Sequence, residues 1–131
     1  MHLGGKLMIK VSVHKQNENG DVITLLEELH VVYNGRSLTV PAGFESDGAS
    51  VPQFLWSTVS PALDPRTLRA AIVHDYLYRT TPPGWTRKEA DELFYDFCRE
   101  DGLSWWASQK AYWGVRIFGG SSWQDFDGEE L

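Results

Sequence analysis

Cysteine is nearly absent from this chain, because Cys98 is the only one among 131 residues. A single cysteine cannot form an internal disulfide, which excludes a disulfide-stapled scaffold and favours a reducing compartment, or a fold that needs no staple. A zinc site is also poorly supported, because one cysteine and no paired histidine spacing do not supply the usual ligand set.

Long apolar runs and blocks of positive charge are missing as well. No run approaches the roughly 18 apolar residues that are needed to span a membrane, and residues 1–6 lack the apolar stretch of a signal peptide. We therefore expect a protein that is not transmembrane and is made in a cytoplasm. No stripe of lysine or arginine is visible, which argues against nucleic-acid binding as the main role.

The negative charge is concentrated at the C-terminal end. The formal net charge is −6, and four of the carboxylates lie in the last seven residues. We therefore predict an acidic mobile tail over 124–131. Hydrophobic residues make up 42 % of the chain, which is ample for one core. Residues 1–123 are accordingly predicted to form a single domain.

The first forty residues have the pattern of strands. Residues 6–15 alternate apolar and polar side chains with the period of two that is typical of a half-buried strand. Asn19-Gly20 and Asn34-Gly35 are hairpin signals, because both residue types tolerate positive φ. The further predicted strands cover 22–25, 29–33 and 36–40. Together these strands predict a small antiparallel meander of three or four strands.

Helices are predicted after a loop over 41–63 that is rich in Gly, Ser, Asp and Pro. The predicted helices cover about 65–78, 86–101 and 104–119. The first would begin at Asp64-Pro65, an N-cap residue followed by proline at the first helical position. The second begins with the capping box of residues 86–89. A β meander followed by three helices predicts an α+β fold in one domain.

The clearest chemical pattern is the pentad His-Asp-Tyr-Leu-Tyr at 74–78, followed by Asp91. His74 and Tyr78 share a helix face, and a short connection between antiparallel helices could bring Asp91 against His74. In one interpretation His74 is a general base, Asp91 holds its other ring nitrogen, and Tyr78 fixes Asp91. In the other, the same three residues are a structural network of buried polar groups. The sequence leaves both open.

Asp75 and Asp47 are candidate ligands for a hard cation, with calcium as the suggested cofactor. Asp75 points to a sector next to His74 and could bind Ca²⁺ through its oxygens. Asp47-Gly48 could form a turn whose oxygens face a cation, or a loop organised by its own Asx-type bonds. Ser50 is a weaker candidate nucleophile, because no G-x-S-x-G elbow surrounds it.

Aromatic residues crowd the third predicted helix, at Trp105, Trp106, Tyr112, Trp113 and Phe118. Such residues most often form core, which is the expectation here, and the alternative is a surface that contacts protein or lipid. Trp105 and Trp106 differ by about 100° in direction, so we do not expect both to be fully buried.

Several motifs occur in a fixed order along residues 36–123. They are a loop at 44–56 that contains Ser-Asp-Gly-Ala-Ser-Val-Pro at 46–52, the pentad at 74–78, Ala-Asp with a following Phe at 90–94, and an aromatic segment with Arg and Gly at 112–123. This set resembles a family of small, functionally uncharacterised phage and prophage proteins. The resemblance implies a phage origin, often among late structural or tail-region genes, but no established activity.

A second resemblance is local. His74-Asp75-x-x-Tyr78, with Asp91 on the next helix, is similar to the motif of secreted and prokaryotic phospholipase A2. That resemblance implies His74 as the base and Asp75 as a calcium ligand. It implies that Tyr78 and Asp91 orient the histidine. The Gly-rich, Cys-containing calcium loop and the disulfides of that family have no counterpart here, although Asp47 and its glycine could replace the loop.

Three functional hypotheses follow. The leading one is a phage- or prophage-encoded accessory or virion protein of the tail or baseplate, which acts by contacts with other phage structural proteins. The alternative is a calcium-dependent, phospholipase A2-like ester hydrolase that uses His74 and Asp75. The third is an intracellular phage module that binds a host protein. We expect the protein in the host cytoplasm when made, and in the virion under the first hypothesis. A hydrolase needs His74 to face a cleft, whereas a structural network buries it.

Overall fold

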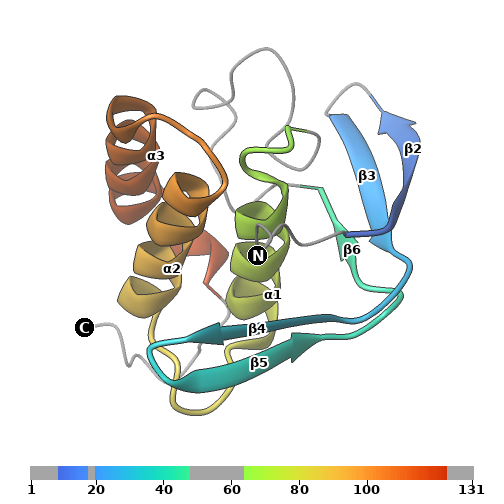
Figure 1. Cartoon of the computed structure of the whole chain (residues 1–131), viewed down its shortest axis with the longest axis horizontal. Helices are drawn as coiled ribbons and strands as arrows, with labels where there is room; N and C mark the ends of the chain where they lie inside the picture. The colour runs from blue at the N-terminus through green and yellow to red at the C-terminus, as the bar shows by residue number, and fades with distance from the viewer. Residues whose placement is uncertain (1–8, 18–19, 48–63, 124–131) are drawn as a thin grey trace, which may run out of the picture.

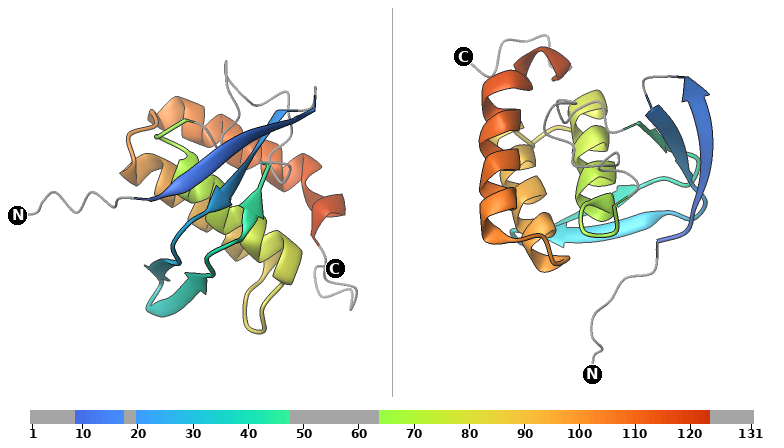
Figure 2. Two further views of the ribbon diagram at one scale, coloured as in Figure 1. Left: turned by 90° about the vertical axis from the view of Figure 1, so that its right-hand side faces the viewer. Right: turned by 90° about the horizontal axis from the view of Figure 1, so that it is seen from above.

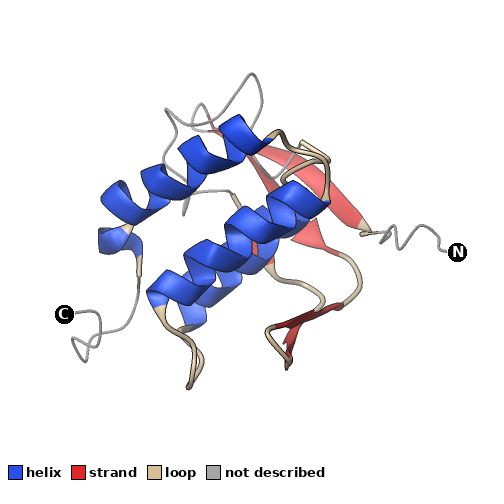
Figure 3. Ribbon diagram, turned by 60° about the vertical axis from the view of Figure 1, so that its left-hand side comes forward, coloured by secondary structure: helices blue, strands red, loops and turns tan. Residues whose placement is uncertain are grey.

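The computed structural model describes residues 9–17, 20–47 and 64–123, so the tail predicted over 124–131 lies outside the described residues. Within them, antiparallel strands precede three helices, and the predicted α+β class is confirmed (Figures 1 and 3). The elements in chain order are β2 (Val11–Asn17), β3 (Gly20–Leu25), β4 (Leu29–Tyr33), β5 (Arg36–Val40), β6 (Glu45–Ser46), α1 (Leu68–Thr80), α2 (Arg87–Glu100), α3 (Trp105–Phe118) and the 3₁₀ turn η2 (Gly120–Ser122).

The strands form two sheets, so the prediction of one meander was wrong. One sheet has the order β2-β3-β6 and the other pairs β4 with β5, all antiparallel. The reason lies after β5, where Gly43 N–H donates to Leu25 O at 2.7 Å and Leu25 N–H donates to Phe44 O at 2.9 Å. The segment that follows β5, including β6, thus occupies the edge of β3 with which β4 would have to pair in a meander. The predicted Asn34-Gly35 turn is confirmed, with both residues at positive φ.

The helix ends follow local capping rules, with one difference from the prediction. The Thr86 side chain accepts from Glu89 N–H at 3.1 Å, which confirms the predicted start of α2. However, α1 begins at Leu68 rather than at Pro65. The Asp64 carboxylate accepts from Arg66 N–H at 2.9 Å, so this side chain closes a separate turn before the helix instead of capping it.

The helices stack in order from the sheets outward, with α1 between the strands and α2, and α3 on the far side of α2 (Figures 1 and 2). The β4–β5 hairpin lies along α2, with Arg36 at Glu89 near the start of the helix and Tyr33 meeting Phe97 edge to face, 5.9 Å between ring centroids, near its end. On α2 an apolar stripe is buried at Ala90, Leu93, Phe94, Phe97 and Cys98. Because α2 is covered on two sides, a polar residue within its buried face must find partners on α1 or α3.

Candidate functional site

Asp91 lies at the meeting point of the three helices. His74 Nε2 of α1 lies 2.7 Å from Asp91 Oδ1, and the Tyr78 hydroxyl donates to the same oxygen at 2.7 Å. The predicted juxtaposition of these three side chains is therefore present. It arises because α1 and α2 pack side by side and Asp91 occupies the buried face of α2. The catalytic roles suggested for the three residues stay predictions.

Two arginines complete this network, and the helical spacing used for His74 and Tyr78 did not identify either. Arg116 of α3 donates from Nη1 to Asp91 Oδ2 at 2.9 Å. Arg87 donates from Nε to the Tyr78 hydroxyl at 3.1 Å and from Nη2 to the carbonyls of Val115 and Arg116 at 2.8 and 2.7 Å. Arg87 thereby satisfies carbonyls in the last turn of α3, where a cation is also favoured by the helix dipole. We call the five connected side chains the buried network: His74, Tyr78, Arg87, Asp91 and Arg116.

The only sequence signal for Arg116 was its place in the ordered set of motifs, and Arg87 stood inside the capping box of α2 without a predicted partner. Both contacts join segments that are distant along the chain, so helical spacing within one element cannot reveal them. The contacts of Arg87 and Arg116 between α2 and α3 follow from the packing of these two helices.

The network is closed to solvent at its centre. His74 and Asp91 have no exposed side-chain surface, and Tyr78 is 1 % exposed. Aromatic rings enclose the imidazole, with Tyr78 at 4.3 Å and Phe94 at 5.0 Å between ring centroids. The structure therefore presents the His74 ring to protein groups rather than to an open cleft, as the structural interpretation requires.

The charge state of Asp91 decides the proton arrangement. Burial acts to raise the pKa of Asp91, but the hydrogen bonds from His74, Tyr78 and Arg116 outweigh it and hold this pKa below its usual value. An ionised carboxylate only accepts hydrogen bonds, so His74 carries its proton on Nε2 and donates it. Burial and the neighbouring negative charge of Asp91 raise the pKa of Tyr78, which keeps this hydroxyl protonated as a donor.

Asp75 and Asp47, the predicted metal ligands, lie on the other side of α1 near β6. Ser46 Oγ donates a hydrogen bond to Asp75 Oδ2. The guanidinium of Arg79 lies 3.3 Å from Asp47 Oδ1 and 3.9 Å from Asp75 Oδ2. A positive side chain thus stands between the two carboxylates, where a calcium ion would need to be. In the described segments no group of three or more His, Cys, Asp or Glu side chains could hold a metal ion.

The remaining candidates of the loop fall outside the part of the chain that the structure describes. Gly48 and Ser50 are both in the range 48–63, so neither the proposed cation turn nor the weaker nucleophile is placed.

The aromatic residues of α3 differ from their expected role. Large apolar side chains that are more than half exposed cover this helix, at Trp105, Trp106, Trp113, Ile117 and Phe118. The expected core role was wrong for the three tryptophans and Phe118, whereas Tyr112 is half-buried. The buried face of α3 carries Ser108, Gly114 and Val115 instead. Small residues on that face let the helices approach closely, and the bulky ones are left outside. Four of them lie within about 120° around the helix, and we call these four the exposed apolar face of α3: Trp105, Trp106, Trp113 and Ile117.

None of the described helices is long and apolar enough to cross a membrane.

Comparison with known proteins identifies the family but no activity. One similar protein is the uncharacterized protein y4jT of Sinorhizobium fredii (strain NBRC 101917 / NGR234), which is 34 % identical over 86 residues. The match covers 66 % of this chain and 25 % of that relative, so the chain spans about a quarter of its length. No solved structure matches significantly. Residues 23–115 match the family described as "Protein of unknown function (DUF1353)", and because this is most of the chain, the protein belongs to the DUF1353 family.

Proposed function

We propose that this protein is a phage- or prophage-encoded accessory protein that acts by protein–protein contacts through the exposed apolar face of α3. The observation that carries the proposal is the exposure of that face, where Trp106 is 71 % and Ile117 is 67 % exposed. Single exposed apolar residues are ordinary, but a gathering of large ones on one helix is typical of an interaction surface. Tryptophan is also among the residues that contribute most to binding when an interface covers them.

The buried network supports this proposal as a framework. Two arginines attach the C-terminal half of α3 to α1 and α2. Arg116 donates a hydrogen bond to Asp91, and Arg87 donates to the Tyr78 hydroxyl and to carbonyls of α3. A rigidly held helix loses little conformational freedom when it docks, which favours binding. The fully buried histidine is then explained as a structural residue, with no need for an open cleft.

The placement in a virion rests on the resemblance of the ordered motifs to phage and prophage proteins. It is tested by mass spectrometry of purified particles of the phage that encodes the chain. We expect to detect the protein in particles, and its absence from them would contradict a virion role. Substituting Trp106 and Ile117 together by serine should deplete it from particles without lowering the unfolding free energy, because both side chains face solvent. Lys110→Ser, at another exposed position of α3, is the matched control.

Binding to a host protein is a variant of the same proposal. If the protein is absent from particles but still requires Trp106 and Ile117 for its effect on the phage cycle, the contact surface stands and the partner is a host protein. If neither particle content nor the phage cycle depends on these two residues, the proposed contact surface is wrong.

A phospholipase-type hydrolase is the second candidate, and one observation favours it. Asp91 Oδ1 lies 2.7 Å from both His74 Nε2 and the Tyr78 hydroxyl, which is the orienting arrangement that the local resemblance implies. The burial of His74 and the position of Arg79 between Asp47 and Asp75 weigh against it.

Ester hydrolysis with and without calcium separates the candidates. A hydrolase requires that wild type hydrolyses a phospholipid ester, that His74→Ala abolishes this with little loss of stability, and that Asp75→Asn removes the calcium dependence. Calorimetric titration of calcium into wild type and Asp75→Asn gives an independent readout. Absence of both hydrolysis and calcium binding in wild type would eliminate this candidate.

A further inference from the structure

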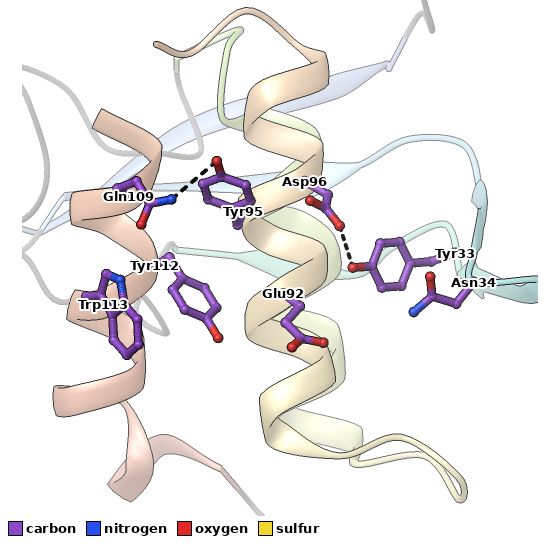
Figure 4. A pocket seen from close by; sticks show the side chains of 8 residues that line it. All are labelled: Tyr33, Asn34, Glu92, Tyr95, Asp96, Gln109, Tyr112 and Trp113. Atoms are coloured by element: carbon purple, nitrogen blue, oxygen red, sulfur yellow. Dashed lines mark hydrogen bonds between the residues drawn. The ribbon is translucent and has the colours of Figure 1, made fainter. Parts of the chain in front are cut away.

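A concave pocket lies where α2, α3 and the turn between β4 and β5 meet (Figure 4). Its volume is about 510 Å³, which falls in the range of roughly 300–1,000 Å³ that is common for ligand pockets. The side chains that give it its character are four aromatic residues and two acids: Tyr33, Tyr95, Tyr112, Trp113, Glu92 and Asp96.

The charge of the pocket is negative. Glu92 and Asp96 are both on α2, and no lysine or arginine is among the described residues that line the pocket. Two cations of the surrounding helices have contacts at or near the pocket, with Glu92 and with Asp91. Lys88 reaches Glu92 only at 4.0 Å with 65 % of its side chain exposed, a contact of little energetic weight. Arg116 is bound to Asp91 in the buried network.

The aromatic walls present ring faces at steep angles to one another. Tyr95 and Tyr112 have centroids 6.1 Å apart with planes at 74°, and Tyr112 and Trp113 have centroids 5.1 Å apart at 78°. The ring of Trp113 is 56 % exposed, so its surface is accessible. The face of an aromatic ring carries partial negative charge and attracts cations, most strongly in tryptophan. Ring faces and carboxylates in one pocket therefore favour the same ligand charge.

Asp96, the pocket acid that contacts Tyr33 of β4, is held in position by a hydrogen bond. The Tyr33 hydroxyl donates to Asp96 Oδ2 at 2.6 Å, and Figure 4 shows this contact beside the pocket. Figure 4 shows the ring of Tyr112 in the space between α2 and α3, whereas the Glu92 side chain lies over α2, between Tyr112 and Tyr33. A cation in this pocket over α2 thus has carboxylates and aromatic side chains among the groups that line it.

We propose that this pocket binds the guanidinium of an arginine side chain carried by the protein that docks on α3. The inference rests on the proposed function, because Trp113 belongs both to the pocket and to the exposed apolar face of α3. A guanidinium is planar, always charged, weakly hydrated and able to stack on aromatic rings while it donates to carboxylates. A neutral side chain lacks the attraction to Glu92 and Asp96, and an acidic one is repelled.

The test uses small probes and needs no partner protein. N-acetylarginine amide is titrated at millimolar concentration into the whole chain, and the indole N–H signal of Trp113 is followed by NMR after assignment with Trp113→Phe. We expect a saturable shift of this signal. N-acetylcitrulline amide has nearly the same shape without the charge and should bind at least about tenfold more weakly, since a tenfold change is 1.4 kcal/mol.

Variants confirm the location of the binding. Glu92→Gln should weaken N-acetylarginine amide about tenfold, which corresponds to the loss of one charge-assisted hydrogen bond. Glu28→Gln, an exposed acid at the opposite end of β4, should leave the affinity unchanged. Equal binding of the arginine and citrulline probes, or no effect of Glu92→Gln, would overturn the proposal. Tighter binding of tetramethylammonium than of N-acetylarginine amide would also overturn it, in favour of a site for small quaternary ammonium ligands.

The outcomes separate this inference from the proposed function. If the arginine probe fails to bind while Trp106 and Ile117 are still required in particles or in the phage cycle, the docking surface stands and the pocket proposal falls. If the probe binds but those two residues are dispensable, the docking proposal falls, and with it the assignment of the arginine to a docked partner.

Discussion

Asp91 of α2 and Arg116 of α3 form an ion pair with 2.9 Å between Oδ2 and Nη1. Asp91 is fully buried, whereas 22 % of the Arg116 side chain is exposed. Because the other carboxylate oxygen of Asp91 contacts His74 and Tyr78, this one residue connects all three helices. The position of α3, and with it the orientation of its exposed apolar face, depends on this pair.

Arg116→Ala is expected to lower the free energy of unfolding by about 3–5 kcal/mol, because it leaves a buried carboxylate without its cation. Urea unfolding followed by tryptophan fluorescence measures the change. Lys110→Ala, at an exposed position of the same helix, should stay within about 0.5 kcal/mol of wild type. A loss below about 1 kcal/mol in Arg116→Ala would mean that the pair does not hold α3 in place.

The depressed pKa of Asp91 predicts how stability depends on pH. Since the pKa of Asp91 in the folded protein lies below its usual value, the ionised carboxylate contributes its full stabilisation at pH values above the pKa that it has in the unfolded chain. This contribution is lost as the pH falls below about 4 and through the folded pKa. Wild type should therefore lose more stability than Asp91→Asn between pH 5 and strongly acidic conditions, although the variant is the less stable protein at neutral pH.

Urea unfolding at a series of pH values provides that comparison. The pKa of Asp64 is also lowered, by its hydrogen bond with Arg66, and this contribution is common to both proteins. Parallel pH profiles for wild type and Asp91→Asn would contradict the assignment of the depressed pKa to Asp91.

Gly119 has a steric role next to the network. A Cβ atom at this position would lie 2.5 Å from the carbonyl oxygen of Val115 and 3.2 Å from the Tyr78 hydroxyl. Gly119→Ala should therefore cost about 1–3 kcal/mol of stability, as overpacking does elsewhere. At Gly120 the nearest atoms belong to Arg87 at 3.7 Å, an ordinary contact, so Gly120→Ala is the matched control with a much smaller effect. Thermal or urea unfolding of both variants decides the question, and equal stability losses would refute a specific clash at Gly119.

Cys98 should be chemically inert in the folded protein. Its side chain is fully buried, and burial, followed by the nearby charges of Asp101 and Asp64, raises the pKa of the thiol to about 12. Because the thiolate is the nucleophile, iodoacetamide at neutral pH is expected to modify Cys98 only after unfolding in urea. Mass spectrometry of the intact protein gives the readout. Rapid modification of the native protein would show that α2 opens readily.

Much of the secondary structure was predictable because it depends on short-range signals. The Thr86 cap, the apolar stripe of α2 and the Asn34-Gly35 turn are each decided within a few residues, and all appear in the structure. The start of α1 was misplaced since Asp64 uses its carboxylate for a local turn with Arg66. The division into two sheets was not predictable, because β6 competes with β4 for the same edge of β3 across a long stretch of chain.

In the candidate site, too, short-range sequence patterns were informative, whereas contacts between segments far apart in the sequence were not predicted. Helical spacing placed His74 and Tyr78 on one face, and the buried stripe of α2 placed Asp91 toward them. The contribution of Arg116 comes from a helix far along the chain, which periodicity within α1 and α2 cannot reveal. The exposure of the α3 tryptophans was likewise hidden, because the same residues would be core if another layer covered them.

The sequence by itself determined the α+β class, the approximate helices and the face that His74 and Tyr78 share, since local capping and helical periodicity decide these. Only the tertiary structure decided that the histidine is buried, that Arg116 completes its surroundings and that the aromatic face of α3 is open to solvent. Burial is a property of all neighbours together, and a helix pattern defines a face without defining what packs against it.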